Sequence, residues 1–313
     1  MEPVIVIVGP TASGKTKLSI ELARRINGEI ISADSMQIYK YMDIGTAKPD
    51  IEEMAGIRHY LIDEVEPGED FSVARYRELA LKYISEVVAK GKHPIIAGGT
   101  GLYVNSLVYN INFSETISDW ELRETLKKEA EEKGNGFLHE KLKQIDPEAA
   151  EKIHENDIKR VIRAIEVFEH TNKPISYHRE MSRQEPPPHR YLTFGLRMDR
   201  QKLYERIEKR VDLMFEKGLV DEVEKLAEKG FNRKTTAMQG LGYKEVFAYL
   251  SGEATLEETK DILKRDTRRY AKRQITWFKR LENAQWLDIN EDTSMAELAK
   301  NIEYHIATSG IFL

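Results

Sequence analysis

The feature that most constrains this chain is a glycine-rich turn between a short hydrophobic strand and a helix. Five consecutive aliphatic residues, Val4 to Val8, predict a strand buried on both faces. The eight residues that follow match the pattern G-x-x-x-x-G-K-S/T; they are Gly9, Pro10, Thr11, Ala12, Ser13, Gly14, Lys15 and Thr16. From Lys15 to Ile26, aliphatic residues repeat at helical spacing. A strand, a glycine turn and a helix in this order predict a phosphate-binding loop, or P-loop.

Such a loop binds phosphate by a mechanism that needs these residue types. Glycines let the backbone fold so that its N–H groups point at phosphate oxygens, and the helix N-terminus adds partial positive charge. The Lys15 ammonium neutralises the ligand, and the Thr16 hydroxyl is suited to ligate Mg²⁺. A turn that matches by chance is the alternative. The loop alone leaves open whether the phosphates belong to a nucleotide such as ATP or to another diphosphate.

Beyond the loop, strand and helix patterns alternate through the N-terminal third of the chain. Glu29 to Ala33 and His93 to Ala97 are short apolar runs that predict strands, and Arg75 to Lys90 predicts a helix between them. The expected fold is therefore α/β, with a P-loop-type parallel sheet flanked by helices. This P-loop core is predicted to span residues 1–113.

The middle of the chain changes character and predicts an all-helical insertion domain at 114–190. Three charged stretches have helical patterns, with no clear strand among them: Asp119 to Lys133, Phe137 to Gln144 and Asp157 to His170. The insertion ends near the three consecutive prolines at 186–188. Tyr191 to Leu196 then alternates like a strand that returns to the sheet. Residues 191–313 are predicted to complete the core and to end in basic helices.

Composition narrows the class of protein further. The chain has 313 residues, of which 41% are hydrophobic, and a formal charge of -5, which fits a protein dissolved in water. No stretch approaches the roughly 18 to 20 apolar residues of a membrane span, and the N-terminus has no signal pattern. The lack of cysteine excludes disulfides, thiolate metal sites and a cysteine nucleophile. We therefore expect a cytoplasmic, monomeric protein with no membrane partner.

A second polar loop follows the strand predicted at Glu29 to Ala33. The carboxyl ends of parallel strands form the ligand crevice, so Asp34 is the carboxylate expected to face the P-loop. It is suited to take a proton from an amine or to ligate metal, while Ser35 and Gln37 are suited to read a base edge. The alternative is that Asp34 caps a turn. The strand before Gly98 offers no carboxylate for Mg²⁺, which weakens a kinase or NTPase interpretation.

The order of these motifs resembles one known family, the tRNA dimethylallyltransferases, also called tRNA isopentenylpyrophosphate transferases. The similarity runs along nearly the whole chain, in Gly9 to Thr16, Asp34 to Tyr39, Ile44 to Pro49, Asp70 to Val73, Gly98 to Tyr103, Asn156 to Glu166, Gln239 to Glu245 and Thr267 to Lys279. The resemblance implies a P-loop-derived fold and Mg²⁺ as cofactor. It also implies transfer of a dimethylallyl group from dimethylallyl diphosphate to the N6 amine of the adenine 3′ of the anticodon in tRNA.

The resemblance further assigns roles to individual side chains. Asp34 is expected to accept the proton of the adenine amine, Thr100 to position the reacting groups, and Lys15 to stabilise the departing diphosphate. The diphosphate is expected on Gly9 to Thr16, with Mg²⁺ on Thr16. The residues expected to contact the anticodon stem-loop are Asp34, Ser35, Met36, Gln37, Thr100, Arg123, Lys159, Arg160, Arg163, Gln239, Gly240, Lys244, Arg268 and Arg269.

Several of the basic residues also have plainer explanations. Lys159, Arg160 and Arg163 lie opposite the apolar face of one predicted helix, where a solvated surface is the simplest interpretation. Arg206 and Arg210 lie i, i+4 among glutamates, which fits ion pairs on a helix. The resemblance directs one of these two arginines to the diphosphate, and the sequence leaves open which.

The densest basic segment is Lys260 to Arg280. Leu263, Tyr270 and Trp277 repeat every seven residues and are predicted to dock on the body of the protein. Six basic side chains are then predicted to be exposed to RNA phosphates, namely Lys264, Arg265, Arg268, Arg269, Lys272 and Arg273.

Two rival classes of protein share some of these features. A small-molecule kinase or NTPase with the same loop predicts ATP turnover. A non-catalytic RNA-binding protein that uses the loop as a switch predicts tRNA binding without a product. His59, His139 and His154 show no metal-like spacing, and we interpret them as structural or surface residues.

Overall fold

The computed structural model describes residues 3–111, 119–181 and 185–308. Its strands are β1 (Pro3–Val8), β2 (Gly28–Ser32), β3 (His59–Tyr60), β4 (His93–Gly98), β5 (Arg190–Met198) and β6 (Gln285–Ile289). The chain divides into two compact units, Met1–Val104 together with Pro188–Leu313, and Asn105–Pro187. The first unit contains every strand found in these three ranges.

The sheet of the first unit is parallel throughout, in the order β3-β2-β4-β1-β5-β6. β1 lies inside the sheet, where Val8 pairs with Gly98 of β4 and with Gly195 of β5. Fully apolar strands such as β1 suit this position, because both of their faces are covered. The predicted α/β class, a parallel sheet flanked by helices with a helical insertion, is confirmed.

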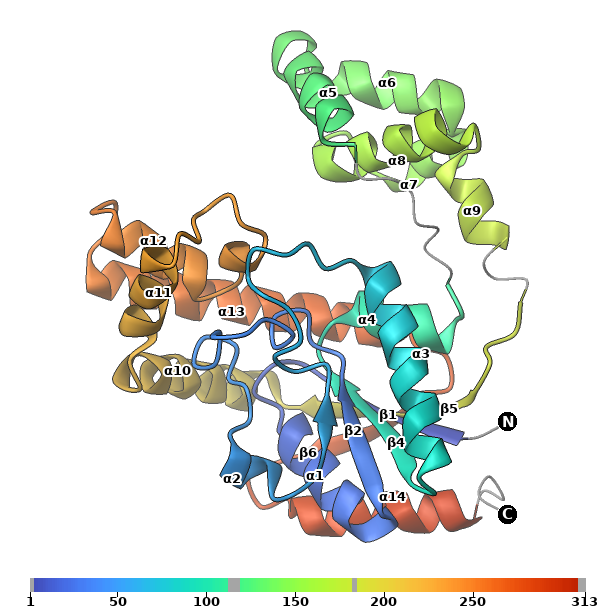
Figure 1. Cartoon of the computed structure of the whole chain (residues 1–313), viewed down its shortest axis with the longest axis vertical. Helices are drawn as coiled ribbons and strands as arrows, with labels where there is room; N and C mark the ends of the chain where they lie inside the picture. Colours follow the sequence, from blue (N-terminus) through green and yellow to red (C-terminus); the bar gives the residue numbers. More distant parts are fainter. Residues whose placement is uncertain (1–2, 112–118, 182–184, 309–313) are drawn as a thin grey trace. The chain divides into compact units, whose positions relative to one another are not determined.

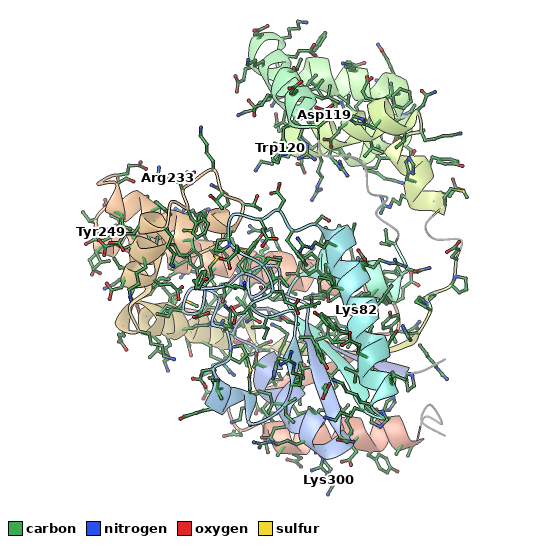
Figure 2. The ribbon with its side chains drawn as sticks, viewed as in Figure 1. Lys82, Asp119, Trp120, Arg233, Tyr249 and Lys300 are labelled. Atoms are coloured by element: carbon green, nitrogen blue, oxygen red, sulfur yellow. The ribbon has the colours of Figure 1, made fainter. Side chains whose placement is uncertain are left out.

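Helices cover both faces of this sheet (Figure 1). On one face, α1 (Lys15–Ile26) and α14 (Met295–Thr308) pack on a core that includes Ile5, Ile7, Ile30 and Phe194. On the other, α3 (Val73–Ala89) contacts β2 and β4. Charged side chains such as Lys82 on α3 and Lys300 on α14 point away from the sheet (Figure 2). The carboxyl edge of the sheet is left for loops.

The C-terminal part of the first unit is mainly helical, as predicted. Its helices are α10 (Arg200–Glu216), α11 (Leu219–Glu228), α12 (Tyr243–Leu250) and α13 (Leu256–Phe278), with a single 3-10 turn, η1, at Ala237–Gln239. α13 packs on α10 and α12. The remaining helices of this unit are α2 (Ile51–Met54), between β2 and β3, and the first half of α4 (Gly101–Val108), which follows β4. The sequence prediction omitted β6 and α14.

The second unit is all-helical in its described residues. It contains α5 (Trp120–Lys133), α6 (Asn135–Ile145), α7 (Pro147–Lys152), α8 (Ile158–Thr171) and α9 (Ile175–Met181). A core of residues such as Leu126, Leu138 and Val161 holds these helices together. The predicted start of the insertion, at 114, lies outside the described residues. None of the helices in the described part of the chain combines the length and apolar character that a bilayer span requires.

Candidate active site

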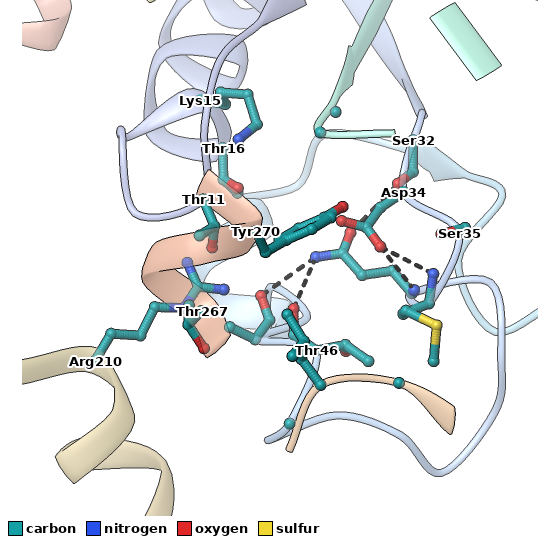
Figure 3. A pocket seen from close by; sticks show the side chains of 18 of the residues that line it. Thr11, Lys15, Thr16, Ser32, Asp34, Ser35, Thr46, Arg210, Thr267 and Tyr270 are labelled. Atoms are coloured by element: carbon teal, nitrogen blue, oxygen red, sulfur yellow. Dashed lines mark hydrogen bonds between the residues drawn. The ribbon is translucent and has the colours of Figure 1, made fainter. Parts of the chain in front are cut away.

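The first unit contains a cavity of about 360 Å³ at the carboxyl edge of the sheet (Figure 3). The P-loop residues Thr11, Lys15 and Thr16 line it, as do the loop after β2 and the end of β4. Asp34, Ser35, Met36, Gln37, Gly98, Gly99, Arg210, Gln239, Gly240, Lys244, Tyr270, Arg273 and Gln274 also contribute to its wall. The structure thus brings together residues from six separate parts of the sequence.

The P-loop adopts a backbone that few residue types tolerate. Ala12 has φ 62° and Gly14 has φ 92°, both in the left-handed region, and α1 begins directly after Gly14. Alternation of left- and right-handed residues turns successive N–H groups toward one side, where an anion can bind. Glycine at position 14 relieves the steric cost of this conformation. The predicted helix Lys15 to Ile26 agrees with α1 at both ends.

Lys15 lies deep in the cavity without a carboxylate within ion-pair distance among the described residues. Its Nζ donates a hydrogen bond to the Pro10 carbonyl (2.8 Å). Burial lowers the pKa of Lys15 to about 7, although the charge of Asp34 raises it, and the charge of Arg210 lowers it further. Burial likewise lowers the pKa of Arg210 from its ordinary value. An anion bound here would restore favourable surroundings for both cations.

The structure shows which of Arg206 and Arg210 reaches the cavity, a choice that the sequence left open. In Figure 3, Arg210 extends from α10 toward the cavity, whose wall it joins. Arg206 is exposed and does not line the cavity, but its Nη2 lies 3.9 Å from where a Cβ on Gly14 would be. Arg210 therefore reaches the interior, while Arg206 lies beside the start of α1.

Asp34 both caps a turn and faces the cavity, so the two sequence interpretations are compatible. Its Oδ1 accepts hydrogen bonds from the backbone N–H groups of Met36 (2.9 Å) and Gln37 (3.4 Å). Among the described residues, none makes a hydrogen bond to its Oδ2. One carboxylate oxygen of Asp34 thus stabilises the turn, and the other is free to contact a ligand.

Thr100 forms hydrogen bonds with the loop that carries Asp34. Its Oγ1 accepts a hydrogen bond from Ser35 N–H (2.9 Å) and donates to Ser35 Oγ (3.2 Å), while its own N–H donates to the Ala33 carbonyl (3.0 Å). Thr100 is outside the cavity wall, although Gly98 and Gly99 belong to it. In this state Thr100 contacts the loop that carries Asp34.

The predicted base readers are also engaged with the protein. The Gln37 side chain accepts from Ser32 Oγ (3.3 Å) and donates to the carbonyls of Thr46 (3.4 Å) and Ala47 (3.3 Å). Met36 packs so tightly on Gly240 that a Cβ there would lie 2.4 Å from Met36 Cε. These contacts fix the shape of the wall near Asp34.

Gln239 and Lys244 flank Gly240 in the same wall, and each contacts a neighbour. Gln239 Nε2 donates to the Arg233 carbonyl, and Lys244 lies 3.5 Å from a carboxylate oxygen of Glu245. The structure therefore brings the 239–244 segment to the side of the cavity that carries the Asp34 loop.

Several cavity residues from α13 were missed as site residues, among them Tyr270 and Gln274. Gln274 accepts from Thr11 N–H (2.8 Å) and donates to the Gly99 carbonyl (2.9 Å), so it ties α13 to the P-loop and to the end of β4. Tyr270 was predicted to dock on the body, but its ring lies between the P-loop side chains and Asp34 in the view of Figure 3. The spacing of Thr267, Tyr270 and Gln274 on one helical face was the available signal.

The three histidines have different surroundings. His139 Nε2 donates to the carbonyls of Ala150 (3.0 Å) and Ile153 (2.8 Å), and His154 is exposed, which fits structural and surface roles. His59 instead lines the cavity, and its Nδ1 donates to the Ile57 carbonyl (2.9 Å). Burial lowers the pKa of His59, against the opposing effect of that carbonyl.

The basic segment on α13 is less exposed than the sequence suggested. Lys264 lies 2.6 Å from Asp212, and Arg268 contacts Glu208, so both side chains lie against α10 with 22% and 30% of their surface exposed. The prediction that all six cations are exposed is therefore wrong for these two. Arg265 and Arg269 share Asp266 (2.9 and 3.3 Å). The heptad prediction holds for Leu263, which is buried.

In the second unit, the basic residues surround a carboxylate that sequence analysis did not single out. Arg123 donates two hydrogen bonds to Glu166 (2.8 and 3.0 Å), and Arg163 donates a third. Burial raises the pKa of Glu166, but these arginines outweigh it and lower the pKa below its usual value. Arg160 lies 3.3 Å from Asp157, and Lys159 is exposed. Arg123 and Arg163 thus have a structural contact apart from any contact with RNA.

The donors around the P-loop suit a magnesium ion that is held mainly by the phosphates of a bound substrate. Among the described residues, no group of three or more histidine or acidic side chains forms a metal site. Thr16 presents an exposed hydroxyl at the cavity, and Asp34 is the acidic residue of its wall. Mg²⁺ commonly keeps several waters and binds substrate phosphates with few protein ligands.

Together, the fold and the cavity define an α/β protein with a P-loop-type turn that opens into a polar, cationic pocket. The profile of the family described as IPP transferase matches residues 37–281. A 67% identical relative, a tRNA dimethylallyltransferase of Acetivibrio thermocellus, is matched over 100% of both chains. The chain therefore belongs to the IPP transferase family.

Solved structures agree with this assignment. A tRNA isopentenylpyrophosphate transferase of Bacillus halodurans is 44% identical, with a TM-score of 0.73 and 98% of each chain covered. A eukaryotic dimethylallyltransferase, described as acting on tRNA, is 30% identical with a TM-score of 0.82; the match covers 99% of this chain and 80% of that one. The described fold is thus the fold of enzymes whose names specify a tRNA substrate.

Proposed function

We propose that this enzyme transfers a dimethylallyl group from dimethylallyl diphosphate to the N6 amine of the adenine 3′ of the anticodon in tRNA. The products are N6-isopentenyladenosine and diphosphate. The observation that carries the proposal is the composition of one cavity, in which the cations Lys15 and Arg210 share a wall with Asp34. Family membership supplies the chemical identity of the two substrates.

The cationic side of the cavity is suited to bind and release diphosphate. The N–H groups of the P-loop, the Lys15 ammonium and Arg210 bind its oxygens and stabilise the negative charge that develops as the C1–O bond breaks. Because both cations are desolvated in the free protein, this binding gains more than the same contact would at an exposed site. Lys15 and Arg210 thus act on the leaving group.

Mg²⁺ is part of the proposal. Thr16 is the residue that would hold it beside the diphosphate, since its hydroxyl faces the cavity. When bound, the ion supplies further neutralisation of the leaving diphosphate.

The opposite side of the cavity is suited to the acceptor. An adenine amine is barely basic or acidic, so its proton needs to leave only as the new C–N bond forms. The Oδ2 of Asp34 is placed to take that proton, while Oδ1 keeps its hydrogen bonds to Met36 and Gln37. Thr100 positions Asp34 through Ser35. The base must be unstacked to enter, which costs less in an anticodon loop than in a duplex.

The tRNA is proposed to bind over both units. In the first, Ser35, Gln239, Gly240 and Lys244 lie at the cavity, and Arg268 and Arg269 lie on α13. In the second, Arg123, Lys159, Arg160 and Arg163 are proposed to contact phosphates of the anticodon stem-loop. We further propose that the enzyme is a cytoplasmic monomer.

One incubation separates this function from its rivals. The protein is mixed with Mg²⁺, labelled dimethylallyl diphosphate and tRNA, and label in the tRNA is measured; a parallel sample contains labelled ATP. Transfer of the dimethylallyl group to adenine is the expected result. Faster ATP hydrolysis or phosphoryl transfer would establish a kinase or NTPase, and tRNA binding without product would establish a binding protein.

A further inference from the structure

Glu222, on α11, binds a loop of the cavity wall without lining the cavity itself. Its Oε2 accepts from the backbone N–H groups of Asp43 (2.9 Å) and Ile44 (2.7 Å), and its Oε1 accepts from Gly45 N–H (3.1 Å). Oε1 also accepts from the hydroxyl of buried Tyr243 (2.6 Å). Four donors to its two oxygens use the full acceptor capacity of a carboxylate. Such charge-assisted bonds are stronger than neutral ones.

The loop that Glu222 binds, residues 43–47, does not hold its shape by residue preference alone. Ala47 has φ 45°, a left-handed conformation that is unfavourable for a residue with a Cβ. A Cβ on Gly45 would lie 2.6 Å from the Tyr243 ring, so the loop passes directly over that ring. Hydrogen bonds within the loop, such as Ala47 N–H to the Ile44 carbonyl (3.0 Å), and the three donated to the Glu222 carboxylate together fix this backbone.

The 43–47 loop in turn fixes the groups nearest to the proposed acceptor site. Gly45, Thr46 and Ala47 line the cavity. The carbonyls of Thr46 and Ala47 accept the two hydrogen bonds donated by the Gln37 amide. The N–H of Gln37 also donates to Oδ1 of Asp34, so the loop and the proposed proton acceptor share one residue. Hydrogen bonds, together with the loop backbone and Gln37 between them, thus connect Glu222 on α11 to Asp34.

We propose that Glu222 is a positioning residue for the acceptor side of the reaction: its carboxylate sets the 43–47 loop, and through Gln37 it sets the place of the adenine relative to Asp34. The proposal rests on the proposed function of the cavity. It predicts that Glu222 affects the use of RNA and leaves the diphosphate side, formed by the P-loop, Lys15 and Arg210, unchanged. A displacement of about 1 Å at a reacting group can cost roughly a hundredfold in rate.

The test compares Glu222→Ala and Glu222→Gln with wild type and with Glu224→Ala, which removes an exposed carboxylate from the same helix. For each protein we would measure kcat/KM with an anticodon stem-loop RNA, and the Kd for dimethylallyl diphosphate. A second RNA carries 2,6-diaminopurine, which keeps the 6-amine, at the target position. This RNA reports how strictly the acceptor base is positioned.

Glu222→Ala is expected to lower kcat/KM for the RNA by about 10- to 100-fold and to weaken the preference for adenine over 2,6-diaminopurine, with the Kd of the diphosphate unchanged. Glu222→Gln keeps one acceptor oxygen and is expected to lose less; Glu224→Ala should match wild type. If Glu222→Ala keeps wild-type selectivity, or weakens diphosphate binding as much as RNA use, the residue is merely structural and the proposal fails. An inactive wild type would instead overturn the proposed function and this inference with it.

Discussion

Two cations of the cavity, Lys15 and Arg210, have different neighbours from the cations on the surface helices. Lys15 and Arg210 have no carboxylate within ion-pair distance in the described part of the chain, and burial lowers the pKa of both. In contrast, Arg268 and Arg269 on α13 and Arg163 on α8 each contact an acidic side chain. The cations of the two groups are chemically similar, but a bound anion gains more free energy from the unpaired cations of the cavity than from the paired cations of the helices.

This difference suits a chain of net charge -5 to the two anionic substrates that we propose for it. A diphosphate that meets desolvated, unpaired cations gains strong and localised interactions. A tRNA phosphate that meets Arg268 has to replace Glu208, so each such exchange contributes little by itself. We therefore expect single changes in the cavity to have large effects, and changes on the helices to have small effects that accumulate.

The largest effect is expected at the proposed proton acceptor. Asn at position 34 keeps an Oδ1 acceptor for Met36 and Gln37, so the turn should persist while the basic oxygen is lost. Asp34→Asn should lower the single-turnover prenylation rate by about two to four decades and leave tRNA affinity nearly unchanged. Rate and affinity are measured on one preparation. Full activity in the variant would remove Asp34 from the mechanism.

A smaller effect is expected on diphosphate binding when Lys15 is replaced, in addition to its effect on the rate of transfer. Lys15→Met should weaken binding of dimethylallyl diphosphate by about 10- to 100-fold, the usual worth of a hydrogen bond to a charged group. Lys17→Met, an exposed neighbour on α1, is the matched control. Isothermal titration calorimetry checks both. Equal affinities for the two variants would place the diphosphate elsewhere.

The pH dependence of that binding should follow Lys15. With a pKa of about 7, Lys15 loses its proton in the free enzyme as pH rises above 7, and a bound diphosphate favours the protonated form. The apparent Kd should therefore increase between pH 7 and pH 9, by up to about tenfold per pH unit. Binding at pH 8 should be accompanied by proton uptake, detected as a dependence of the binding enthalpy on the buffer. A Kd that is constant over this range, or proton release, would contradict the assignment.

The smallest effect is expected on the helices. Each phosphate contact changes the slope of log affinity against log salt by about one unit. Since Arg268 and Arg269 already contact Glu208 and Asp266, we expect Arg268→Ala with Arg269→Ala together to flatten the slope by about one unit, for all tRNAs alike. Gln37→Ala should alter base preference and leave the slope unchanged. The reverse pattern would mean that Gln37 contacts phosphates and that the two arginines determine base preference.

Local signals in the sequence were sufficient for the elements that carry the P-loop. The hydrophobic run of β1, the glycine turn and the helical repeat of α1 are contiguous, so short-range preferences determine them. β6 was missed because Gln285–Ile289 is a short edge strand with polar residues in place of a fully apolar run. Edge strands lack the two-sided burial that makes β1 conspicuous.

The parts of the site that escaped prediction depend on contacts between distant residues. Gln274 reaches Thr11 across 263 positions, and Glu222 reaches Ile44 across 178. No local pattern encodes such partners. The same holds for Glu166, whose burial beneath Arg123 and Arg163 follows from the packing of α5 on α8. The sequence therefore identified residues of the site more reliably than it identified the residues that they contact.

The most direct test of the central claim, that one cavity joins diphosphate and adenine amine, is a structure of the enzyme with an anticodon stem-loop and a non-transferable thio analogue of dimethylallyl diphosphate. We predict the diphosphate on the loop Gly9 to Thr16, with Lys15 and Arg210 in contact. The adenine N6 should lie about 2.6 to 3.2 Å from Oδ2 of Asp34. An adenine bound outside this cavity, or a diphosphate away from the P-loop, would contradict the account.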